Sequence, residues 1–515
     1  MGISLALVAL LMMMGWAWSV VNWIWLKPRR LERTLREQGF HGNPYKLFHG
    51  DSKEMITIEK EAQSKPMDIS NDIIARALPF HHLSTNCYGK NYFMWIGPLA
   101  KINIEDPKLI REVLLNHEVF QKPMSNPLGK LLLKGLLVQE GQSWATHRRI
   151  INSAFHPRKL KNMVLAMNQS CREMIRKWEA LVSTSGGACE LDVWPYFSNL
   201  AADVISRTAF GSNYEQGERI FRLQREQAML AFQVLQSVYI PGSRFLPTKT
   251  NRRMKEIHGE VGALLRDVIT KRERAIQEGD DHAEDDLLGI LLKTNLKEIQ
   301  EQGNKKQSGL SIEEVIEECK TFYFAGQETT SALITWAMVL LAIHQNWQAR
   351  ARQEVLAVFG DDEPHFDALN QLKLLTMILY EVLRLYSVGP VLIRTTQKTA
   401  KLGDYVLPPG VVISIPIIAV HHNPEFWGDD AAEFKPERFG DGVPEAAKSR
   451  GTFFPFSRGP RICIGQMFAL MEAKLAMAKI LRHFLFKLSP SYVHAPCVRA
   501  VLQPQYGARL IIEKI

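Results

Sequence analysis

A long apolar run at the N-terminus decides how this chain is organised. The sequence from Ile3 to Leu26 is almost wholly apolar, and about 20 such residues cross a bilayer as a helix. It is too long for the apolar part of a secretory signal, and no basic residue precedes it. Lys27, Arg29 and Arg30 follow it directly, which favours a cytosolic position for the rest of the chain. We predict a single-pass membrane anchor over residues 1–30 and one cytosolic domain over residues 31–515.

This domain is expected to be mainly α with minor β. No Pro/Ser-rich linker divides the 515 residues, and 46% of them are hydrophobic, which is enough for a large core. Most segments show the periodicity of amphipathic helices. Short β-like runs occur at Tyr92–Ile96, Ala100–Ile104, Tyr405–Leu407 and Val411–Ile417. Charged, glycine-containing stretches at 278–286 and 302–308 are predicted to be exposed loops.

Net charge and cysteine content indicate the kind of partner and the cellular compartment of this protein. The net charge is +9, but there is no basic tract with interleaved aromatic residues and no nucleic-acid-binding motif. We therefore expect no nucleic-acid partner and attribute the charge to a membrane face or an acidic protein partner. The six cysteines show neither paired nor metal-type spacing, which fits a reduced cytosolic setting.

One cysteine has an unusual setting. Cys463 lies in Phe456-Ser-Arg-Gly-Pro-Arg-Ile-Cys-Ile-Gly465, directly before a stretch that is expected to be helical. The positive end of the helix dipole and the charge of Arg461 favour a thiolate, the form that binds a metal. Gly459 and Gly465 let the backbone turn tightly, approach a flat ligand and point N–H groups at the sulfur. For a thiol taken alone, a buried structural cysteine is the alternative.

The pattern Phe-x-x-Gly-x-Arg-x-Cys-x-Gly overturns that alternative, because it resembles the haem-binding segment of the cytochrome P450 family. The resemblance covers roughly residues 40–515 and implies the cytochrome P450 haem-thiolate fold, preceded here by a transmembrane helix. It implies haem b (iron protoporphyrin IX) with the Cys463 thiolate as the iron ligand. Phe456, Gly459, Arg461 and Gly465 are expected to contact the haem. The implied activity is that of a monooxygenase using O2 at the endoplasmic reticulum membrane.

A second segment matches the part of the family that handles oxygen. Ser311-Ile-Glu-Glu314 is typical of a capping box and opens a long helix, in which Ala325-Gly-Gln-Glu-Thr-Thr330 follows midway. A helix kink is one interpretation of the poor helix formers Gly326 and Thr329. The resemblance implies instead that Ala325 and Gly326 let haem and O2 approach the backbone. It also implies that Thr329 donates a hydrogen bond to iron-bound oxygen and that Glu328 relays protons.

A third motif is expected to support the haem from behind. Glu381-Val-Leu-Arg384 places two opposite charges on one helix face, which by itself indicates no more than a surface pair. It is followed by Phe434-Lys-Pro-Glu-Arg-Phe439, which matches another element of the family. The resemblance implies a structural network of Glu381, Arg384 and Arg438.

The haem propionates also need cations, and guanidinium groups suit carboxylates best. Trp144-Ala-Thr-His-Arg148 resembles the family's Trp-x-x-x-Arg helix, with Trp144 and Arg148 on one face. Arg394 and Arg461 are the other candidates, and an ordinary surface arginine is the alternative for each. Because Cys463 occupies the axial position, we interpret His147, His421 and His422 as ordinary polar residues.

The resemblance extends to a narrower plant group. Trp25–Arg30, Gly39–Tyr45 and Phe48–Asp51 are similar to the group that includes secologanin synthase and triterpenoid oxidases. This implies oxidation of an isoprenoid, either a triterpenoid or steroid skeleton or an iridoid such as loganin. Bulky apolar residues in 124–137, in 232–247 and just after Arg384 suit such a substrate. Core packing explains them equally well.

Electrons are expected from a partner, because no flavin- or dinucleotide-binding motif is apparent. The resemblance implies NADPH–cytochrome P450 reductase, docking an acidic surface near Arg458 and Arg461. Three other classes of protein remain as alternatives. They are a haem-thiolate isomerase or dehydratase that uses no O2, a non-catalytic haem-binding protein, and a membrane scaffold without haem, which would leave the motifs unexplained.

Overall fold

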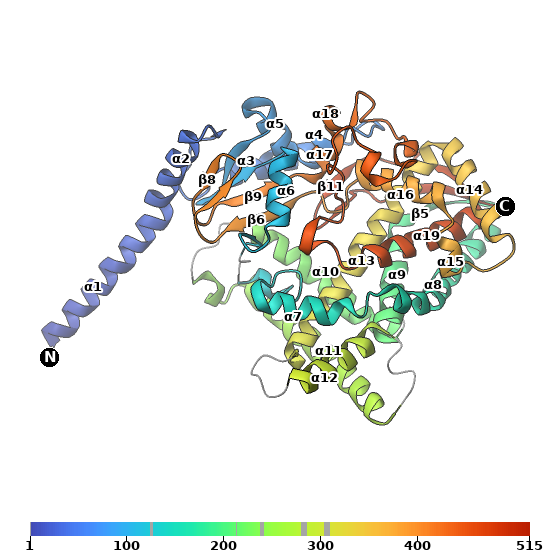
Figure 1. Ribbon diagram of the computed structural model, residues 1–515, viewed down its shortest axis with the longest axis horizontal. Helices are drawn as coiled ribbons and strands as arrows, with labels where there is room; N and C mark the ends of the chain where they lie inside the picture. Colours follow the sequence, from blue (N-terminus) through green and yellow to red (C-terminus); the bar gives the residue numbers. More distant parts are fainter. Residues whose placement is uncertain (1, 124–126, 213, 237–241, 280–285, 303–308) are drawn as a thin grey trace.

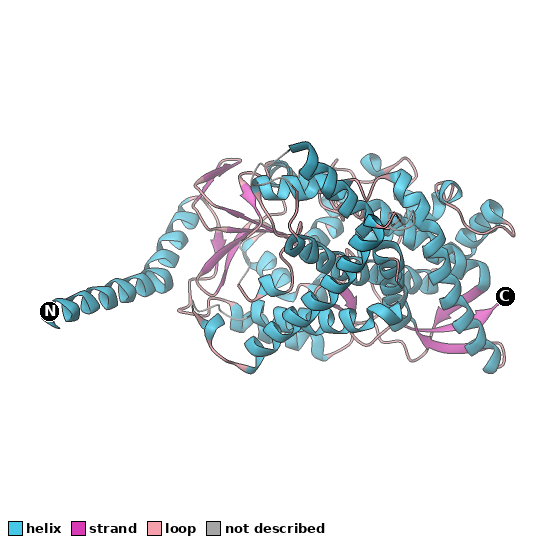
Figure 2. Cartoon of the chain, turned by 90° about the horizontal axis from the view of Figure 1, so that it is seen from below, coloured by secondary structure: helices cyan, strands magenta, loops and turns pink. Residues whose placement is uncertain are grey.

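The computed structural model describes residues 2–123, 127–212, 214–236, 242–279, 286–302 and 309–515. A broad, mainly helical body carries strands in two groups, near the N-terminal helix and near the C-terminus (Figures 1 and 2). The predicted class, mainly α with minor β, is confirmed. The loops predicted at 278–286 and 302–308 lie for the most part outside the described residues.

The elements have the following bounds. The helices are α1 (Gly2–Val21), α2 (Lys27–Glu37), α3 (Ser52–Ser64), α4 (Ile74–Ala77), α5 (Pro79–Tyr88), α6 (Pro107–Leu115), α7 (Gly141–Asn152), α8 (Pro157–Thr184), α9 (Val193–Phe210), α10 (Tyr214–Gln236), α11 (Lys249–Gln277), α12 (Leu287–Gln302), α13 (Ile312–Ile343), α14 (Gln345–Phe359), α15 (Phe366–Leu369), α16 (Lys373–Leu385), α17 (Ile417–His422), α18 (Pro424–Trp427) and α19 (Gln466–His483). The strands are β1 (His41–Gly42), β2 (Tyr92–Ile96), β3 (Leu99–Asn103), β4 (Phe120–Gln121), β5 (Ala188–Asp192), β6 (Leu392–Thr396), β7 (Ala400–Leu402), β8 (Tyr405–Leu407), β9 (Val412–Ile415), β10 (Phe484–Leu488), β11 (Pro496–Val498), β12 (Leu502–Pro504) and β13 (Arg509–Lys514).

The N-terminal helix projects from the body (Figure 1). A π-helical turn at Asn22–Leu26 joins α1 to α2. The stretch Leu7–Glu37 is long and apolar enough to cross a membrane, with a mean hydropathy of 1.7 in its most apolar window, and none of that window is buried in the body. The second part of the helix packs on the body instead, since Leu31 and Leu35 are buried. The helix therefore continues past residue 30, where we placed the end of the anchor.

A six-stranded sheet, in the order β1-β2-β3-β9-β6-β4, lies beside the N-terminal helix. The predicted strand at Tyr92–Ile96 has these bounds in the structure, whereas the strand predicted at Val411–Ile417 is shorter, Val412–Ile415. It ends before Pro416, which has no N–H for the ladder. The register of β6 against β9 sets Arg394 opposite Ile413.

Helix α13 runs through the body and is buried along most of its length. The predicted capping box is present: the Ser311 hydroxyl accepts the Glu314 N–H, and the Glu314 carboxylate accepts the Ser311 N–H. The helix ends at Ile343, and α14 begins at Gln345. It packs against α9 on one side and α19 on the other.

Candidate active site

The Cys463 segment is a tight loop that closes on itself before α19. The Cys463 N–H donates to the Phe456 carbonyl at 2.9 Å. Gly459 has φ +74°, and a Cβ there would lie 2.6 Å from the Leu114 carbonyl oxygen at the end of α6. This position therefore requires glycine, both for the turn and for the close approach.

Cys463 is an exposed residue, although protein atoms crowd its thiol, and we call the space that this residue faces the recess. Burial raises the pKa of the thiol, while the Gly465 N–H and the charges of Arg148 and Lys122 oppose that rise. We expected Arg461 and the helix dipole to lower this pKa. That expectation was wrong for the protein alone, because burial outweighs the charges. Coordination to a metal would deprotonate the thiol.

Arg461 is buried and turned toward α7. Its guanidinium lies 4.1 Å over the Trp144 ring and donates to the Gln139 carbonyl and the Glu140 carboxylate. Its Nε and Nη1 groups are buried without a hydrogen-bond partner among the described residues. Such a group is costly to leave unpaired. A side chain this enclosed has no surface to offer a docking protein, which corrects the expectation that Arg461 helps to bind a reductase.

Three other cations gather around the recess. Arg148 of α7 donates to the Ile462 carbonyl at 2.8 Å, next to Cys463. Burial and the charge of Arg461 lower the pKa of Arg394 to about 10. Burial and the charges of Arg394 and Arg461 lower the pKa of Lys122 to about 7. The sequence analysis missed Lys122, because it stands outside every motif and joins the others only through folding.

These side chains fit the haem that the Cys463 segment implies. The neighbouring cations depress one another's pKa values, and Arg461 has buried N–H groups without a partner among the described residues. Added negative charge would stabilise both, and the two propionates of haem supply it. The thiol that faces the recess provides a suitable iron ligand. The residues present are therefore compatible with haem b.

Helix α13 approaches the Cys463 segment through Phe155, because a Cβ at Gly465 would lie 3.9 Å from Phe155 Cε1 and 4.0 Å from Cys463 Sγ. The Phe155 ring lies 6.0 Å from the Phe322 ring of α13 and 6.3 Å from the Phe468 ring of α19. Ala325 and Thr329 continue the Phe322 face at intervals of three and four residues, and both are exposed although the helix around them is buried. The Thr329 hydroxyl donates to the Ala325 carbonyl at 2.7 Å.

Gly326 faces elsewhere. A Cβ at this position would lie 3.0 Å from Cγ1 and Cδ1 of Ile205 on α9. The missing side chain therefore allows α13 and α9 to cross closely. This corrects the expectation that Gly326 opens the helix to the haem, and it leaves Ala325 as the small residue on the exposed face.

Glu328 lies on the side of α13 that faces α10. Its carboxylate is 3.9 Å from the guanidinium of Arg225, which is half exposed. Burial raises the pKa of Glu328, and Arg225 opposes that rise. The side chain thus links the helix that carries Thr329 to a residue at the surface.

The structure brings Glu381, Arg384 and Arg438 together. Arg384 donates to both Glu381 oxygens, at 2.7 and 2.8 Å, and both side chains are fully buried. Arg438 Nε lies 3.5 Å from Glu381, but its Nη1 donates to Asp430 at 2.8 Å and lowers the pKa of that carboxyl to about 2. Asp430 is a fourth member of the network, which no local motif reveals.

Among the described residues, no group of three or more His, Cys, Asp or Glu side chains is arranged to hold a metal ion. His421 and His422 are buried, and burial lowers the pKa of both. His147 differs, since its Nδ1 pairs with Glu318 of α13 at 2.5 Å. Burial lowers the pKa of His147, but the hydrogen bond and charge of Glu318, with help from Glu314, leave it raised.

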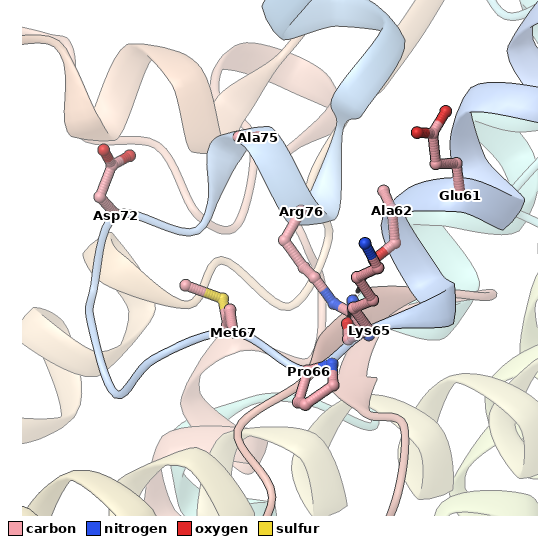
Figure 3. A pocket seen from close by; sticks show the side chains of 8 residues that line it. All are labelled: Glu61, Ala62, Lys65, Pro66, Met67, Asp72, Ala75 and Arg76. Carbon is pink, nitrogen blue, oxygen red and sulfur yellow. Dashed lines mark hydrogen bonds between the residues drawn. The ribbon is translucent and has the colours of Figure 1, made fainter.

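Two surface hollows are also present. One, of about 360 Å³, lies over the outer side of the Cys463 loop and includes Phe456, Arg458 and Ile462 in its lining. The other, of similar volume, lies between the end of α3 and α4 (Figure 3). There Arg76 donates to the carbonyls of Ala62 and Lys65, which indicates a role in joining the two helices.

Comparison with known proteins supports the same interpretation. Residues 78–512 match the family described as Cytochrome P450. The chain is 54% identical to Cytochrome P450 72A397 of Kalopanax septemlobus, and the match covers 97% of this chain and 96% of the relative. It is 51% identical to 7-deoxyloganic acid hydroxylase of Catharanthus roseus, with the same coverage. Among solved structures, retinoic acid bound cyanobacterial CYP120A1 has a similar fold, with a TM-score of 0.73, 24% identity and coverage of 86% of this chain and 96% of that one.

Proposed function

Since the chain belongs to the cytochrome P450 family and is therefore a haem-thiolate monooxygenase, we propose that its substrate is a plant isoprenoid, either an iridoid or a triterpenoid or steroid skeleton. The observation that carries this proposal is the similarity to 7-deoxyloganic acid hydroxylase over nearly the whole chain. An iridoid acid is accordingly the first substrate to test. The recess beside Cys463 and the apolar residues of the neighbouring segments suit either class.

The haem, when bound, activates O2 for insertion of one oxygen atom into the substrate, with electrons from NADPH delivered by a reductase. We assign the iron ligand to the Cys463 thiolate. The Gly465 N–H near the sulfur reduces the charge on the thiolate and tunes its donor strength. Gly459 keeps the loop in the conformation that presents the sulfur, with Phe456 closing it through the backbone.

We assign the haem propionates to Arg148, Arg394 and Arg461, together with Lys122. The Trp144 ring holds the Arg461 guanidinium in place from one side, and Glu140 holds it from the other. The free Nε and Nη1 groups of Arg461 are then available to a carboxylate. Behind this group, Arg384 donates to the carbonyls of Ala431 and Glu433, and Glu381 accepts the Lys435 N–H, so the network holds the segment that precedes the Cys463 loop.

Protons are proposed to pass along α13. Arg225 at the surface meets Glu328, whose pKa is raised by burial, so this carboxyl holds its proton to a higher pH than an exposed glutamate does. Thr329 is the next residue and is exposed on the face shared with Ala325. Its hydroxyl both accepts and donates hydrogen bonds, so it is suited to pass a proton from the Glu328 side to the recess.

We place the protein in the endoplasmic reticulum membrane, with α1 as a single span and residues 31–515 in the cytosol. The reductase is proposed to bind over the outer side of the Cys463 loop, where Arg458 lies at the hollow described above. Reduction that depends on ionic strength would support electrostatic docking there.

The proposal is tested in yeast microsomes that contain the chain and a plant reductase. The microsomes are incubated with NADPH and either 7-deoxyloganic acid or a panel of triterpenes, and products are detected by a mass increase of one oxygen atom. The reduced-CO spectrum is recorded on the same sample, with Cys463→Ser as the control that lacks the ligand.

A thiolate-type reduced-CO band together with a product from one pool supports the activity and selects the substrate class. The same band without a product from either pool overturns the isoprenoid proposal and leaves the haem site in place. Absence of the band in folded, haem-supplied protein contradicts the assignment of Cys463.

A further inference from the structure

A buried carboxylate joins three elements beside the recess. Glu318 of α13 is fully buried, and its Oε1 accepts the Leu136 N–H at 2.7 Å and pairs with Nδ1 of His147 at 2.5 Å. Leu136 belongs to the segment that precedes α7, and His147 belongs to α7 itself. One side chain of α13 therefore holds both the backbone of this segment and the helix that follows it.

Gly135 allows that contact. A Cβ at Gly135 would lie 2.6 Å from Oε2 of Glu318 and 2.7 Å from its carboxyl carbon. The φ of Gly135 is not positive, so the backbone itself would accept alanine without strain. The absence of a side chain is explained by the close approach of the Glu318 carboxylate.

The same helix holds the segment at a second point. The Lys320 ammonium, almost fully buried, donates to the Leu131 carbonyl at 3.0 Å and to the Glu317 carboxylate at 3.1 Å, and it contacts His258 Nδ1 at 3.0 Å. Both contacts with the segment are made to its backbone. Its register on α13 is thus set by Glu318 and Lys320, whichever side chains the segment carries.

The C-terminal end of the segment lies at the cations around Cys463. Glu140 accepts the Lys122 N–H at 2.8 Å, and the Gln139 carbonyl accepts a hydrogen bond from the Arg461 guanidinium, also at 2.8 Å. Further toward its other end, Leu128 and Leu132 pack in a cluster with Ala231 of α10 and Met254 of α11. The described residues 127–140 therefore form a wall between α13, α10 and the candidate haem site.

We propose that Glu318 is a positioning residue, which fixes this wall and the rotation of α7 on α13. It thereby fixes the shape of the recess in which the substrate binds, and the placement of Trp144 and Arg148. The inference rests on the proposed function. A buried ion pair adds little net stability compared with well-packed apolar residues, whereas its direction-dependent hydrogen bonds specify geometry. The role of Glu318 is therefore to specify geometry.

The test compares four single variants and one double variant, Glu318→Ala combined with Gly135→Ala, in the haem-loaded, full-length protein. Glu318→Ala removes the joint, Glu318→Gln keeps an acceptor for the Leu136 N–H, and Gly135→Ala pushes the segment away while leaving every polar group in place. Glu313→Gln is the control, since Glu313 lies on the first turn of α13 in an exposed pair with Arg266. Three rates or affinities are measured: trypsin cleavage at the exposed Lys130 and Lys134, transfer of haem to apomyoglobin, and binding of imidazole to the iron by its spectrum.

We expect Glu318→Ala and Gly135→Ala each to speed cleavage and haem transfer and to change the imidazole Kd by about tenfold, the scale of one hydrogen bond to a buried charge. Glu318→Gln should retain most of the wild-type behaviour, and Glu313→Gln all of it. The double variant should resemble Glu318→Ala alone, because Gly135→Ala then meets no carboxylate and the two changes are not additive.

Wild-type cleavage, haem transfer and imidazole binding in Gly135→Ala would overturn the inference, and so would additive effects in the double variant. If Glu318→Ala does not fold, Gly135→Ala and Glu318→Gln decide the matter. None of these readouts requires a substrate. Failure of the isoprenoid proposal would appear in the product assay with these three measurements unchanged, so the two failures are distinguishable.

Discussion

At the scale of single residues, burial sets the protonation of the groups around the recess as strongly as the nearest charge does. Burial is the largest influence on the pKa values of Cys463, Lys122 and Glu328, although each has charged neighbours. For the carboxyl and the thiol the effect is upward, and for the lysine it is downward, since a low-dielectric surrounding disfavours the charged form in each case. The thiol, the lysine and the carboxyl are therefore all shifted toward their neutral forms.

Glu328 provides a pH-dependent prediction at this scale. Because its pKa is raised by burial, the carboxyl is protonated below the raised pKa and loses its proton as the pH rises through it. The amount of product formed per NADPH consumed should therefore fall as the pH rises through the pKa of Glu328. Glu328→Gln should be low throughout, by at least about tenfold, and flat over the interval. The measurement is product and NADPH consumption between pH 5.5 and 8.5, with Glu313→Gln as the control; a variant with the wild-type pH profile would remove Glu328 from the proton path.

At the scale of elements, the crossing of α13 and α9 determines which α13 residues face the recess. Gly326 packs against Ile205, while Ala325 and Thr329 are exposed on another face. The three are close in sequence, but the helical rotation of 100° per residue separates Gly326 from the other two. Composition alone does not distinguish a glycine that admits a ligand from one that admits a neighbouring helix.

Gly326→Ala tests this assignment. The added methyl group would lie 3.0 Å from Ile205, and overpacking of this kind costs about 1–3 kcal/mol, partly offset by the helix propensity of alanine, about 1 kcal/mol. We expect a lower unfolding temperature with a normal reduced-CO band, and recovery when Ile205→Val is added. Normal stability with impaired haem binding would return Gly326 to the haem-facing role.

The network behind the candidate haem site gives a second prediction for the elements. Glu381→Ala leaves the guanidinium of Arg384 buried without its carboxylate, a change that costs about 3–5 kcal/mol. We expect protein that fails to hold haem. Glu437→Ala is the matched control, because Glu437 forms a half-exposed pair with Arg350 and should cost at most about 1 kcal/mol. Haem content and folded yield are measured for both; full haem content in Glu381→Ala would contradict the assignment.

At the scale of the whole molecule, the projecting helix contacts the body through its second part, from Ile24 onward. The Tyr45 hydroxyl donates to the Ile24 carbonyl at 2.6 Å, and the Tyr45 N–H donates to Glu32. Leu31 and Leu35 add apolar contacts with the sheet end. The apolar residues from Leu7 to Trp23 are mainly exposed, so the body depends little on them.

Deletion of residues 2–23 is therefore expected to release the protein from membranes while the reduced-CO band is retained. The deletion spares the contacts of Tyr45 with Ile24 and Glu32. Sedimentation of microsomes in high and low salt, followed by a spectrum of the supernatant, provides the measurement. Retention in the pellet at high salt would show that a second part of the body holds the membrane, and loss of the band would show that the anchor supports the fold.

The sequence by itself determined the mainly helical class, the capped helix α13, the apolar N-terminal segment and the haem-thiolate family. These depend on local properties: periodicity, a capping box over four residues, an uninterrupted apolar run and a loop that needs glycine at fixed positions. The bounds of β2 at Tyr92–Ile96 follow from the same kind of information, whereas the strand predicted at Val411–Ile417 was too long, because Pro416 ends it.

Only the tertiary structure decided which side chains meet. Lys122, Asp430 and Glu318 stand outside every motif. Glu318 meets Leu136 and His147 from 182 and 171 residues away, and Asp430 turns back on Arg438 through the loop between them. The tertiary structure likewise turned Gly326 toward α9 and buried Arg461 against α7. The physical reason is that pairing over long sequence distances, and the burial that shifts a pKa, depend on how whole elements pack, which no short window of sequence specifies.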